Sequence, residues 1–453
     1  MSARVAAAWI TVVLAGRLWV ATHWGLLADE AYHWVWSLHP AWGYFDQPPL
    51  IAWVLAATRP VLGETPLALR ALPIGAAIAS VAALTPFARD RVTWLLWGLG
   101  LPPLWLMTQL AVPDTLLIAA WGGALAAVLR GGRWWLLAGV LAGLAAMAKP
   151  TGLLLMPLLL AADPAGRRTP WPWLGAALAA VVVAPNLAWN ALHDGVMFRF
   201  QIAEGLLHPG AAGWLGPVRQ VAEQALFVTP VAGGAALVWA VRRPFDRIDR
   251  LCWAVSVPVL VGFAVAALGG PPEAHWPAPA WLGVGLGLSR SSGRLLRAAG
   301  VGAWLGALAT LTILLHAQLG LLRLGLDPAV RLSQGAVIGA AVARAALPIG
   351  VSAGDPRATE ATAVVTERYQ EAALIHYYTG IPARTLPGCG RRSQYDLWPN
   401  EVPAHAWFVR PARTGVPTCA AAHFSQLRRA PPVGDRDGAG RWVGSWDLYD
   451  VRR

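Results

Sequence analysis

The chain is 453 residues long, and its composition separates it from soluble globular proteins. Hydrophobic residues make up 56% of it, charged residues only 13%, and 26 residues are Trp, which suits the aromatic belts at the two surfaces of a bilayer. The net charge of +12 does not indicate nucleic-acid binding, because the Arg residues form short clusters between apolar segments. The composition predicts a polytopic α-helical membrane protein and excludes a soluble enzyme of this length.

Eleven apolar segments predict membrane-spanning helices. They cover residues 6–24, 67–88, 92–110, 115–129, 134–148, 150–162, 171–189, 221–241, 251–269, 277–288 and 298–322. Several are shorter than the roughly 20 residues of a full crossing. Because a helix could have been missed or split in two, we expect a bundle of about 11–13 spans.

Basic residues recur in every second loop, counted from a cytoplasmic N-terminus. These loops contain Arg89 and Arg91; Arg130 and Arg133; Arg167 and Arg168; Arg242, Arg243, Arg247 and Arg250; and Arg290, Arg294 and Arg297. Such a repeated bias is typical of loops that stay on the cytoplasmic side. It predicts a multi-pass membrane protein whose alternate loops, and whose C-terminal region, lie on the side of the membrane opposite to the cytoplasm.

The predicted outer loops collect the acidic residues and one lysine. Their charged residues are Asp29, Glu30, Asp46, Glu64, Asp114, Lys149, Asp194, Arg199, Glu204, Glu223 and Glu273. Asp114 and Lys149 lie in very short loops, where helix ends hold side chains close together, and charges at a membrane edge usually mark a site. Two simpler interpretations stay open, because Lys149 could snorkel to the interface and Asp114 could cap a helix.

The segment after the first span is the most informative part of the chain. Residues 27–34 contain Asp29-Glu30 with Tyr32 and His33, and residues 43–49 contain Tyr44, Asp46 and Gln47 before two prolines. We expect a folded interfacial loop that faces a polar or cationic substrate. The alternative is a solvated loop with an aromatic belt, in which Asp46 is only a turn residue.

Taken in order, the motifs of the chain resemble those of bacterial glycosyltransferases of the protein O-mannosyltransferase and lipid A aminoarabinosyltransferase type, which are polytopic enzymes of the GT-C superfamily. The resemblance covers nearly the whole chain. It rests on Asp29-Glu30-Ala31-Tyr32, the segment 43–53, Val112-Pro113-Asp114, Ala148-Lys149-Pro150-Thr151, the segments 185–190, 193–194 and 198–201, His275-Trp276-Pro277-Ala278-Pro279, Arg368-Tyr369-Gln370, and Gln394-Tyr395-Asp396-Leu397-Trp398.

The resemblance implies transfer of a sugar from a polyprenyl-phosphate donor, with inversion, to an acceptor at the outer face: lipid A, a polysaccharide or a protein. The acceptor hydroxyl needs a base, for which Asp29 is the first candidate, with Glu30 orienting the acceptor or Asp29. The leaving phosphate needs fixed cations. These are Lys149 and Arg199, with Arg17 as a weaker third.

Three of these residues have more than one expected role. Asp114 would complete the acidic floor of the site, by contacting the acceptor or holding a cation. Trp276 would stack on sugar or lipid, although an interfacial anchor explains it nearly as well. Arg17 lies inside the first span and needs an acid or a lipid phosphate as its partner, unless it shortens the span.

The chain departs from its relatives at His33, where a second Tyr is common, and at Gln47, where a His is common. Gln47 can form hydrogen bonds but cannot ligate a metal or titrate as His does. The oxygens of Asp29, Glu30 and Asp114 would suit Mg²⁺ or Mn²⁺. Since Lys and Arg can neutralise the single phosphate of the donor, we expect that no cofactor is required.

Beyond residue 322 the composition becomes more polar, which predicts two domains: a transmembrane catalytic domain over residues 1–322 and a small periplasmic α/β domain over 323–453. An amphipathic helix is expected at 327–346, a strand at 363–366 and a helix from Tyr369 to Tyr378 that ends near Gly380. Cys252 falls in a span. Cys389 and Cys419 could form a disulfide in an oxidising compartment, with pairing and free thiols equally expected.

A transporter or flippase for lipid-linked sugars is the alternative function. It would also have many spans and intramembrane charges, but transporters place their key polar groups near the bilayer midplane. Here the charges gather in the outer loops. A purely structural scaffold leaves Asp29, Asp114 and Lys149 on one face unexplained.

Overall fold

The structure is a computed structural model that describes residues 3–206, 213–242, 246–270, 272–322, 327–346, 363–399 and 401–453. The chain forms two compact units. The first unit contains Met1–Ala21 and Ala41–Ile313, and the second contains Thr22–Pro40 and Leu314–Arg453. The second boundary falls near the expected division at residue 322. The sequence did not predict that residues 22–40 group with the C-terminal part of the chain.

In the part of the first unit that the structure describes, every regular element is helical. The helices are α1 (Ala3–His23), α3 (Leu50–Leu62), α4 (Pro66–Leu84), α5 (Arg91–Gly100), α6 (Pro102–Met107), α7 (Pro113–Arg130), α8 (Trp134–Ala148), α9 (Leu155–Ala162), α10 (Trp171–Leu192), α11 (Val196–Phe200), α12 (Leu215–Phe227), α13 (Pro230–Ala240), α14 (Arg247–Ala254), α15 (Val257–Ala266), α16 (Ala280–Ser289) and α17 (Gly293–Leu319). Helices α1 and α17 continue by a few residues into the second unit.

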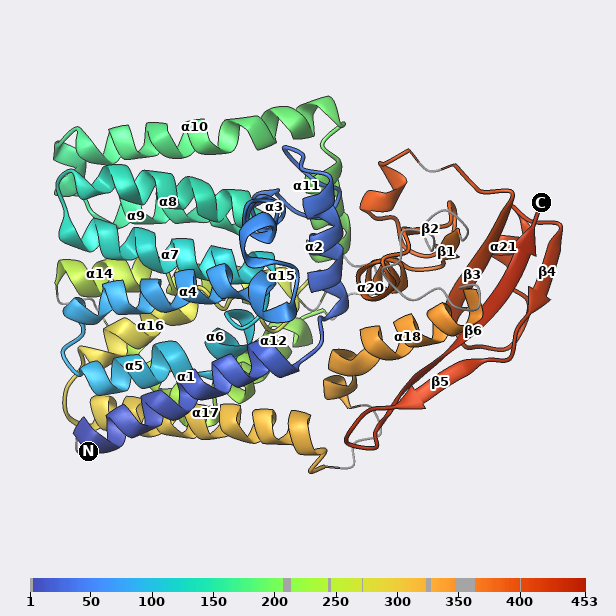
Figure 1. Cartoon of the computed structure of the whole chain (residues 1–453). Helices are drawn as coiled ribbons and strands as arrows, with labels where there is room; N and C mark the ends of the chain where they lie inside the picture. Colours follow the sequence, from blue (N-terminus) through green and yellow to red (C-terminus); the bar gives the residue numbers. More distant parts are fainter. Residues whose placement is uncertain are drawn as a thin grey trace. The chain divides into compact units, whose positions relative to one another are not determined.

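Helices α4, α7, α8 and α10 pack in this order, each against the next (Figure 1). Small residues allow the close approach of α8 and α10. A Cβ atom at Gly139 would overlap the backbone of Gly175, and one at Gly143 would press against Val182. Glycines at helix contacts are typical of membrane proteins, where backbones come close in the absence of a hydrophobic driving force.

Among the described residues, four helices are long and apolar enough to cross a membrane: Pro66–Phe87, Trp171–Leu192, Arg247–Ala266 and Gly293–Leu319. The number rises to six if two bent pairs each form one span, namely Ala7–His23 with Ala28–Leu38 and Leu215–Phe227 with Pro230–Ala240. Shorter apolar helices lie at Leu50–Leu62, Trp134–Ala148, Pro150–Ala162 and Ala280–Ser289. The protein is thus a multi-pass membrane protein, and the count of eleven spans stays a prediction.

Each predicted span coincides with a helix or with two consecutive helices. Prolines explain two of the breaks, because proline lacks the N–H of a helical hydrogen bond and disfavours a helical residue before it. Pro102 separates α5 from α6, and Pro230 separates α12 from α13, which are bent by 119°. The helix α3 was not predicted.

The second unit combines a mixed sheet with helices. Its helices are α2 (Ala28–Leu38), α18 (Arg331–Ala346), α20 (Tyr369–Thr379) and α21 (Thr418–Ala421). Its strands are β1 (Val364–Thr366), β2 (Ala383–Thr385), β3 (His405–Pro411), β4 (Gln426–Arg429), β5 (Val433–Arg436) and β6 (Trp442–Arg452). The strand order is β2-β1-β3-β6-β4, with β5 also paired to β6, and β1 runs parallel to both β2 and β3. Helix α20 packs against α2, α18, β1 and β2.

The small α/β domain expected near the C-terminus is confirmed. The predicted strand is β1, the predicted amphipathic helix is α18, and the predicted helix after Tyr369 is α20. Gly380 follows α20 with a φ of 73°, a left-handed conformation that ends helices and that glycine adopts without strain.

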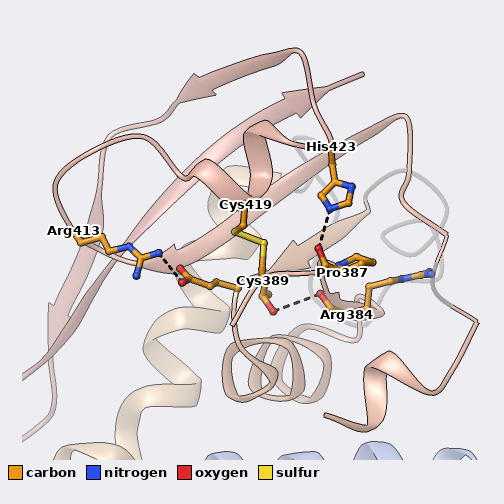
Figure 2. The surroundings of a disulfide bond; sticks show 8 residues. Arg384, Pro387, Cys389, Arg413, Cys419 and His423 are labelled. Atoms are coloured by element: carbon orange, nitrogen blue, oxygen red, sulfur yellow. Dashed lines mark hydrogen bonds and ion pairs between the residues drawn. A yellow bond between two sulfur atoms is a disulfide. The ribbon is translucent and has the colours of Figure 1, made fainter. Parts of the chain in front are cut away.

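Cys389 and Cys419 form a disulfide, with a Cα–Cα distance of 5.5 Å (Figure 2). The bond lies in the core of the second unit, among Leu386, Phe408 and Phe424. Close to it, Nε2 of His423 lies 2.9 Å from the carbonyl oxygen of Pro387. Of the two outcomes that the sequence left open, the structure has the bonded one.

Candidate active site

Lys149 and Asp114 form a buried ion pair in the first unit. Their Nζ and Oδ1 atoms are 2.8 Å apart, and the two residues are only 4% and 6% exposed. The expectation that short loops hold these two side chains close together is therefore confirmed. A buried pair of this kind is strongly coupled, because removal of one partner leaves the other charge without compensation.

The local backbone explains the position of both side chains. Lys149 ends α8 in an extended conformation, and its N–H donates to the carbonyl of Ala145. Pro150 then prevents the helix from continuing in regular form. Asp114 lies in the first turn of α7 after Pro113, where the helix dipole favours a negative charge. The N-cap of α7 is Val112, so the alternative of Asp114 as the cap is wrong.

Trp276 joins this pair. Nζ of Lys149 lies 5.3 Å from the centroid of the Trp276 ring, which is within range of a cation–π interaction. The neighbouring ring of His275 interacts electrostatically with Asp114. Three of the predicted site residues, from loops widely separated in the sequence, thus meet in one cluster, which we call the Lys149–Asp114–Trp276 cluster.

Helix α12 adds two glutamines that the sequence analysis missed. Gln224 donates to the carbonyl of Ala274 over 2.6 Å and accepts from Nε1 of Trp281 over 3.0 Å, which fixes the segment before His275. Gln220 lies one turn earlier and is 2% exposed, yet neither of its amide atoms has a hydrogen-bond partner among the described residues. Gln220 and Gln224 are four residues apart, which places them on the same face of α12. This spacing in a largely apolar segment could have indicated from the sequence that the face is polar.

The segment with Tyr44, Asp46 and Gln47 forms a closed turn in the first unit. The N–H of Tyr44 donates to the carbonyl of Gln47 over 3.2 Å, and Tyr44 and Asp46 are buried. Burial raises the pKa of the Tyr44 hydroxyl above its usual range, against the opposing effect of the hydrogen bond with Ala41. Oε1 of Gln47 is buried and has no hydrogen-bond partner in the described part of the chain. The burial of Tyr44 and Asp46 does not fit the alternative of a solvated loop with an aromatic belt.

Arg199 lies in α11 beside this turn. Its neighbour Phe200 packs on Phe45 with ring centroids 5.2 Å apart, and Gln201 donates to the carbonyl of Asp46 over 2.5 Å. The Arg199 side chain is exposed and forms no ion pair with any residue that the structure describes. A cation in this state can meet an anionic ligand.

Arg17 was expected to pair with an acidic residue or a lipid phosphate, but in the structure it binds backbone carbonyls. Its guanidinium is buried, donates to the carbonyls of Leu99 and Thr108 over 3.2 Å each, and lies over the ring of Trp105. These two carbonyls end α5 and α6, where carbonyl groups lack helical partners and the helix dipole favours a cation. This arrangement indicates a structural role for Arg17. It does not support the expected contact between Arg17 and the donor phosphate.

Asp29 lies in the second unit, within α2. The segment 27–34, expected as part of an interfacial loop, is helical from Ala28 onward, which corrects that expectation. Asp29 is exposed, and its Oδ1 accepts a hydrogen bond over 3.0 Å from the hydroxyl of Tyr369 at the start of α20. The sequence analysis had Tyr369 in a family motif but did not include it among the site residues.

Glu30 is buried and caps its own helix. Its Oε2 accepts from the N–H of Leu27 over 3.1 Å, which is the glutamate half of a capping box. This engagement explains a glutamate at the third position of α2 without any contact to substrate. The expected orienting role of Glu30 stays a prediction.

Tyr32 and His33 are both buried in the second unit. The hydroxyl of Tyr32 accepts from the N–H of Gln394 over 2.6 Å, and its ring lies 4.5 Å from that of Tyr369. The His33 ring meets Trp36 edge-on. Tyr32 therefore helps to hold α2 against the C-terminal part of the same unit, whereas the His33 contact lies within α2. The expected contact of both residues with substrate stays a prediction.

The described residues contain no cluster of three or more His, Cys, Asp or Glu side chains that could hold a metal ion. Each carboxylate proposed as a ligand has a partner of its own: Tyr369 for Asp29, the N–H of Leu27 for Glu30, and Lys149 for Asp114. The donor set for a shared divalent cation does not assemble within either unit.

Comparison with known proteins supports the assignment from the motifs. Residues 46–189 match the family described as dolichyl-phosphate-mannose-protein mannosyltransferase. This segment includes Asp46, Gln47, Asp114 and Lys149. The lipid A galacturonosyltransferase RgtD from Rhizobium johnstonii is 29% identical over 280 residues, which are 56% of this chain. The match covers 58% of the length of that relative.

The fold is also similar to that of ArnT from Cupriavidus metallidurans. Its crystal structure in the apo state has a TM-score of 0.62 at 14% sequence identity and covers 98% of this chain and 97% of the other. The structure bound to undecaprenyl phosphate gives the same TM-score at 15% identity, with 99% and 98% covered.

The fold defines the class: a multi-pass helical membrane protein with a small C-terminal α/β unit, of the architecture found in ArnT. The predicted resemblance is confirmed: residues 46–189 match a mannosyltransferase family, a lipid A glycosyltransferase is similar in sequence, and the fold is similar to that of ArnT.

Proposed function

We propose that the protein transfers a sugar from a polyprenyl-phosphate donor to an acceptor at the periplasmic face of the bacterial inner membrane. The observation that carries the proposal is the Lys149–Asp114–Trp276 cluster within a GT-C fold. Charges inside a membrane protein are costly and mark functional sites. An aromatic ring beside a cation and a carboxylate suits a sugar next to a phosphate.

The chemistry is a single displacement at the anomeric carbon. The acceptor oxygen forms a bond to that carbon, while the bond to the phosphate oxygen breaks and the phosphate leaves with the electron pair. The acceptor proton passes to Asp29, whose second carboxylate oxygen is not engaged by Tyr369. Attack opposite to the leaving group inverts the anomeric configuration.

Cations stabilise the charge that grows on the leaving phosphate. Arg199 is the exposed candidate. Lys149 is the buried one, and its charge is shared with Asp114. Of the two, Arg199 is better placed to meet a phosphate without first breaking an ion pair.

Lipid A is the acceptor that we propose first, because the relative RgtD is described as a lipid A galacturonosyltransferase. The transferred sugar could be a hexose, a pentose or a uronic acid, and each fits the proposal equally well. A polysaccharide or a protein is the alternative acceptor. Nothing in the described site favours the transporter alternative over transfer.

The test compares cells with and without this chain by mass spectrometry of their lipid A, polysaccharides and glycoproteins. Loss of a single sugar mass from one acceptor, restored by the wild-type chain, would support transfer and identify both sugar and acceptor. Unchanged glycoconjugates together with an accumulated or misplaced lipid-linked sugar would favour a flippase.

The side of the membrane is a separate part of the proposal. Reporter fusions after Asp46 and after Arg168 should report the periplasm and the cytoplasm respectively, because Arg167 and Arg168 belong to the predicted basic loops. Finding both fusions on the same side would contradict the proposed topology.

A further inference from the structure

The hydrogen bond between Tyr369 and Asp29 joins residues 340 positions apart within the second unit. It links the first turn of α2 to the first turn of α20, which pack against each other. Asp29 is the only acidic side chain of α2 that is exposed in this part of the structure, since Glu30 is buried as a cap. The tyrosine therefore meets the exposed carboxylate of this helix.

The Tyr369 ring contacts both Tyr32 and Arg391. The Tyr32 ring packs 4.5 Å away, and Cζ of Arg391 lies 5.0 Å from the ring centroid. Tyr32 in turn stacks on Tyr395 at 5.8 Å. A ring packed in this way has few alternative rotamers, so its hydroxyl stays in one place.

The three tyrosines of this stack use their hydroxyls differently. Tyr32 accepts from the N–H of Gln394, which ties the two segments together. The hydroxyl of Tyr395 is buried and has no hydrogen-bond partner among the described residues. The Tyr369 hydroxyl donates to Asp29, the residue proposed as the base. The stack thus contains both a candidate and its matched control.

We propose that Tyr369 is a positioning residue for Asp29, both of which lie in the second unit. The Tyr369 hydroxyl fixes Oδ1 of Asp29 and leaves Oδ2 to receive the proton of the acceptor. This inference rests on the proposed function, in which Asp29 is the base.

An exposed Asp side chain samples several rotamers, and only some of them point a free oxygen at the acceptor. A donor held by a rigid ring removes that freedom before substrate arrives, which lowers the entropy cost of reaching the reactive geometry. The cation of Arg391 on the face of the ring attracts the π electrons and so strengthens the O–H as a donor. Positioning and polarisation therefore act on the same hydrogen bond.

The test uses the full-length protein purified in detergent, polyprenyl-phosphate glycolipids extracted from membranes of the source cells as donors, and lipid A as acceptor. Tyr369→Phe keeps the ring and removes only the hydroxyl. We expect kcat to fall by about tenfold with little change in KM for either substrate, because geometry and not binding is lost. Tyr395→Phe should leave both constants unchanged.

A second measurement separates positioning from stability. Tyr369→Phe should have no further effect on residual transfer when Asp29 is already replaced by Asn, because the hydroxyl acts through that carboxylate. Rates are expressed per folded, monodisperse protein, so a lower yield of Tyr369→Phe does not obscure the result.

Equal kcat values for wild type, Tyr369→Phe and Tyr395→Phe would overturn the inference, and so would an equal loss in the two variants. Both outcomes leave the proposed function standing, because the wild type transfers sugar in each. An inactive wild type whose cells also show unchanged glycoconjugates would instead refute the proposed function itself.

Discussion

Asp29 is the residue on which the proposed chemistry depends most directly. Asp29→Asn keeps the size of the side chain and an oxygen that can accept from Tyr369, but an amide cannot take up the acceptor proton. We expect transfer to fall by at least about a hundredfold, with normal insertion and yield. Activity within about tenfold of wild type, a barrier change of roughly 1.4 kcal/mol, would remove Asp29 from the role of base.

Lys149 requires a double substitution, because its charge is paired with Asp114. Lys149→Met alone leaves a buried carboxylate without compensation, which should destabilise the protein by about 3–5 kcal/mol and confuse stability with activity. Lys149→Met combined with Asp114→Asn removes both charges and should restore the yield of folded protein.

The transfer activity of the double variant then shows whether the Lys149–Asp114 pair has a catalytic or only a structural role. We expect activity to stay low after folding is restored, because the cluster beside Trp276 loses its cation and its carboxylate together. Measured with purified protein, a return of activity in step with yield would show that the ion pair is only structural.

Arg17 and Arg199 form a contrasting pair of cations. Arg17→Met deletes donors to two helix-ending carbonyls, which should lower stability by about 1–3 kcal/mol at nearly normal kcat. Arg199→Met removes an exposed charge, so the melting temperature should stay unchanged while KM for the donor rises. Melting curves and steady-state kinetics on both variants check this, and the reverse assignment of effects would place Arg17 at the donor phosphate.

At the scale of single residues, the sequence identifies costly charges but not their partners. Asp114 and Lys149 were expected close together because short loops hold both, but the ion pair between them was not predicted. Arg17 could not be understood, since its partners are backbone carbonyls at the ends of α5 and α6. The link from Tyr369 to Asp29 was also beyond reach, because no periodic pattern connects residues 340 positions apart.

Among the helices of the second unit, α20 carries a histidine that should make stability depend on pH. Burial lowers the pKa of His376 to about 4, and the nearby His39 contributes in the same direction. The folded protein therefore binds fewer protons than the unfolded chain between about pH 6.5 and pH 4. The stability from neutral His376 is complete above pH 6.5 and is lost as the pH falls towards 4.

His376→Phe should remove this dependence, because Phe keeps the edge-on contact with Trp34 and does not titrate. The pKa difference corresponds to at most about 3 kcal/mol of unfolding free energy. Melting temperatures of the wild type should fall more between pH 7 and pH 4.5 than those of the variant. Parallel curves for the two proteins would show that His376 protonates freely in the folded state.

The apolar segments predicted most elements of the first unit, because long apolar runs are typical of helices that can lie in a membrane. Breaks at Pro102 and Pro230 and the helical state of residues 28–38 were less visible. Helix α2 has buried aromatic and charged residues on most of its surface, so neither an apolar run nor a simple amphipathic stripe indicates it. The buried side chains of α2 are accommodated because the helix packs against α20.

For the whole molecule, the resemblance to membrane glycosyltransferases was predictable because the ordered motifs extend over the length of the chain, and the family match over residues 46–189 agrees with them. The division into units was only partly predictable. Composition changes near residue 322, but the grouping of residues 22–40 with the C-terminal part depends on contacts between α2 and α20. Those contacts involve segments more than 300 residues apart in the printed sequence.

Metal dependence is a property of the whole site and gives the last prediction. Within each unit, the acidic candidates have separate partners in Tyr369, the N–H of Leu27 and Lys149. The proposed leaving group is a single phosphate, whose charge can be met by Arg199 and Lys149. We therefore expect purified protein treated with EDTA to keep most of its transfer activity.

The control for this experiment is the same protein treated with EDTA already saturated with Mg²⁺, which separates chelation from effects of the chelator itself. Addition of Mg²⁺ or Mn²⁺ to the EDTA-treated protein should change the rate by less than about twofold, since oxygen ligands hold these ions only when several converge. Complete loss on chelation with recovery on adding either ion would mean that the carboxylates gather around a required cation. In that case Asp29 would be a ligand, and its hydrogen bond with Tyr369 would orient the metal site instead of the base.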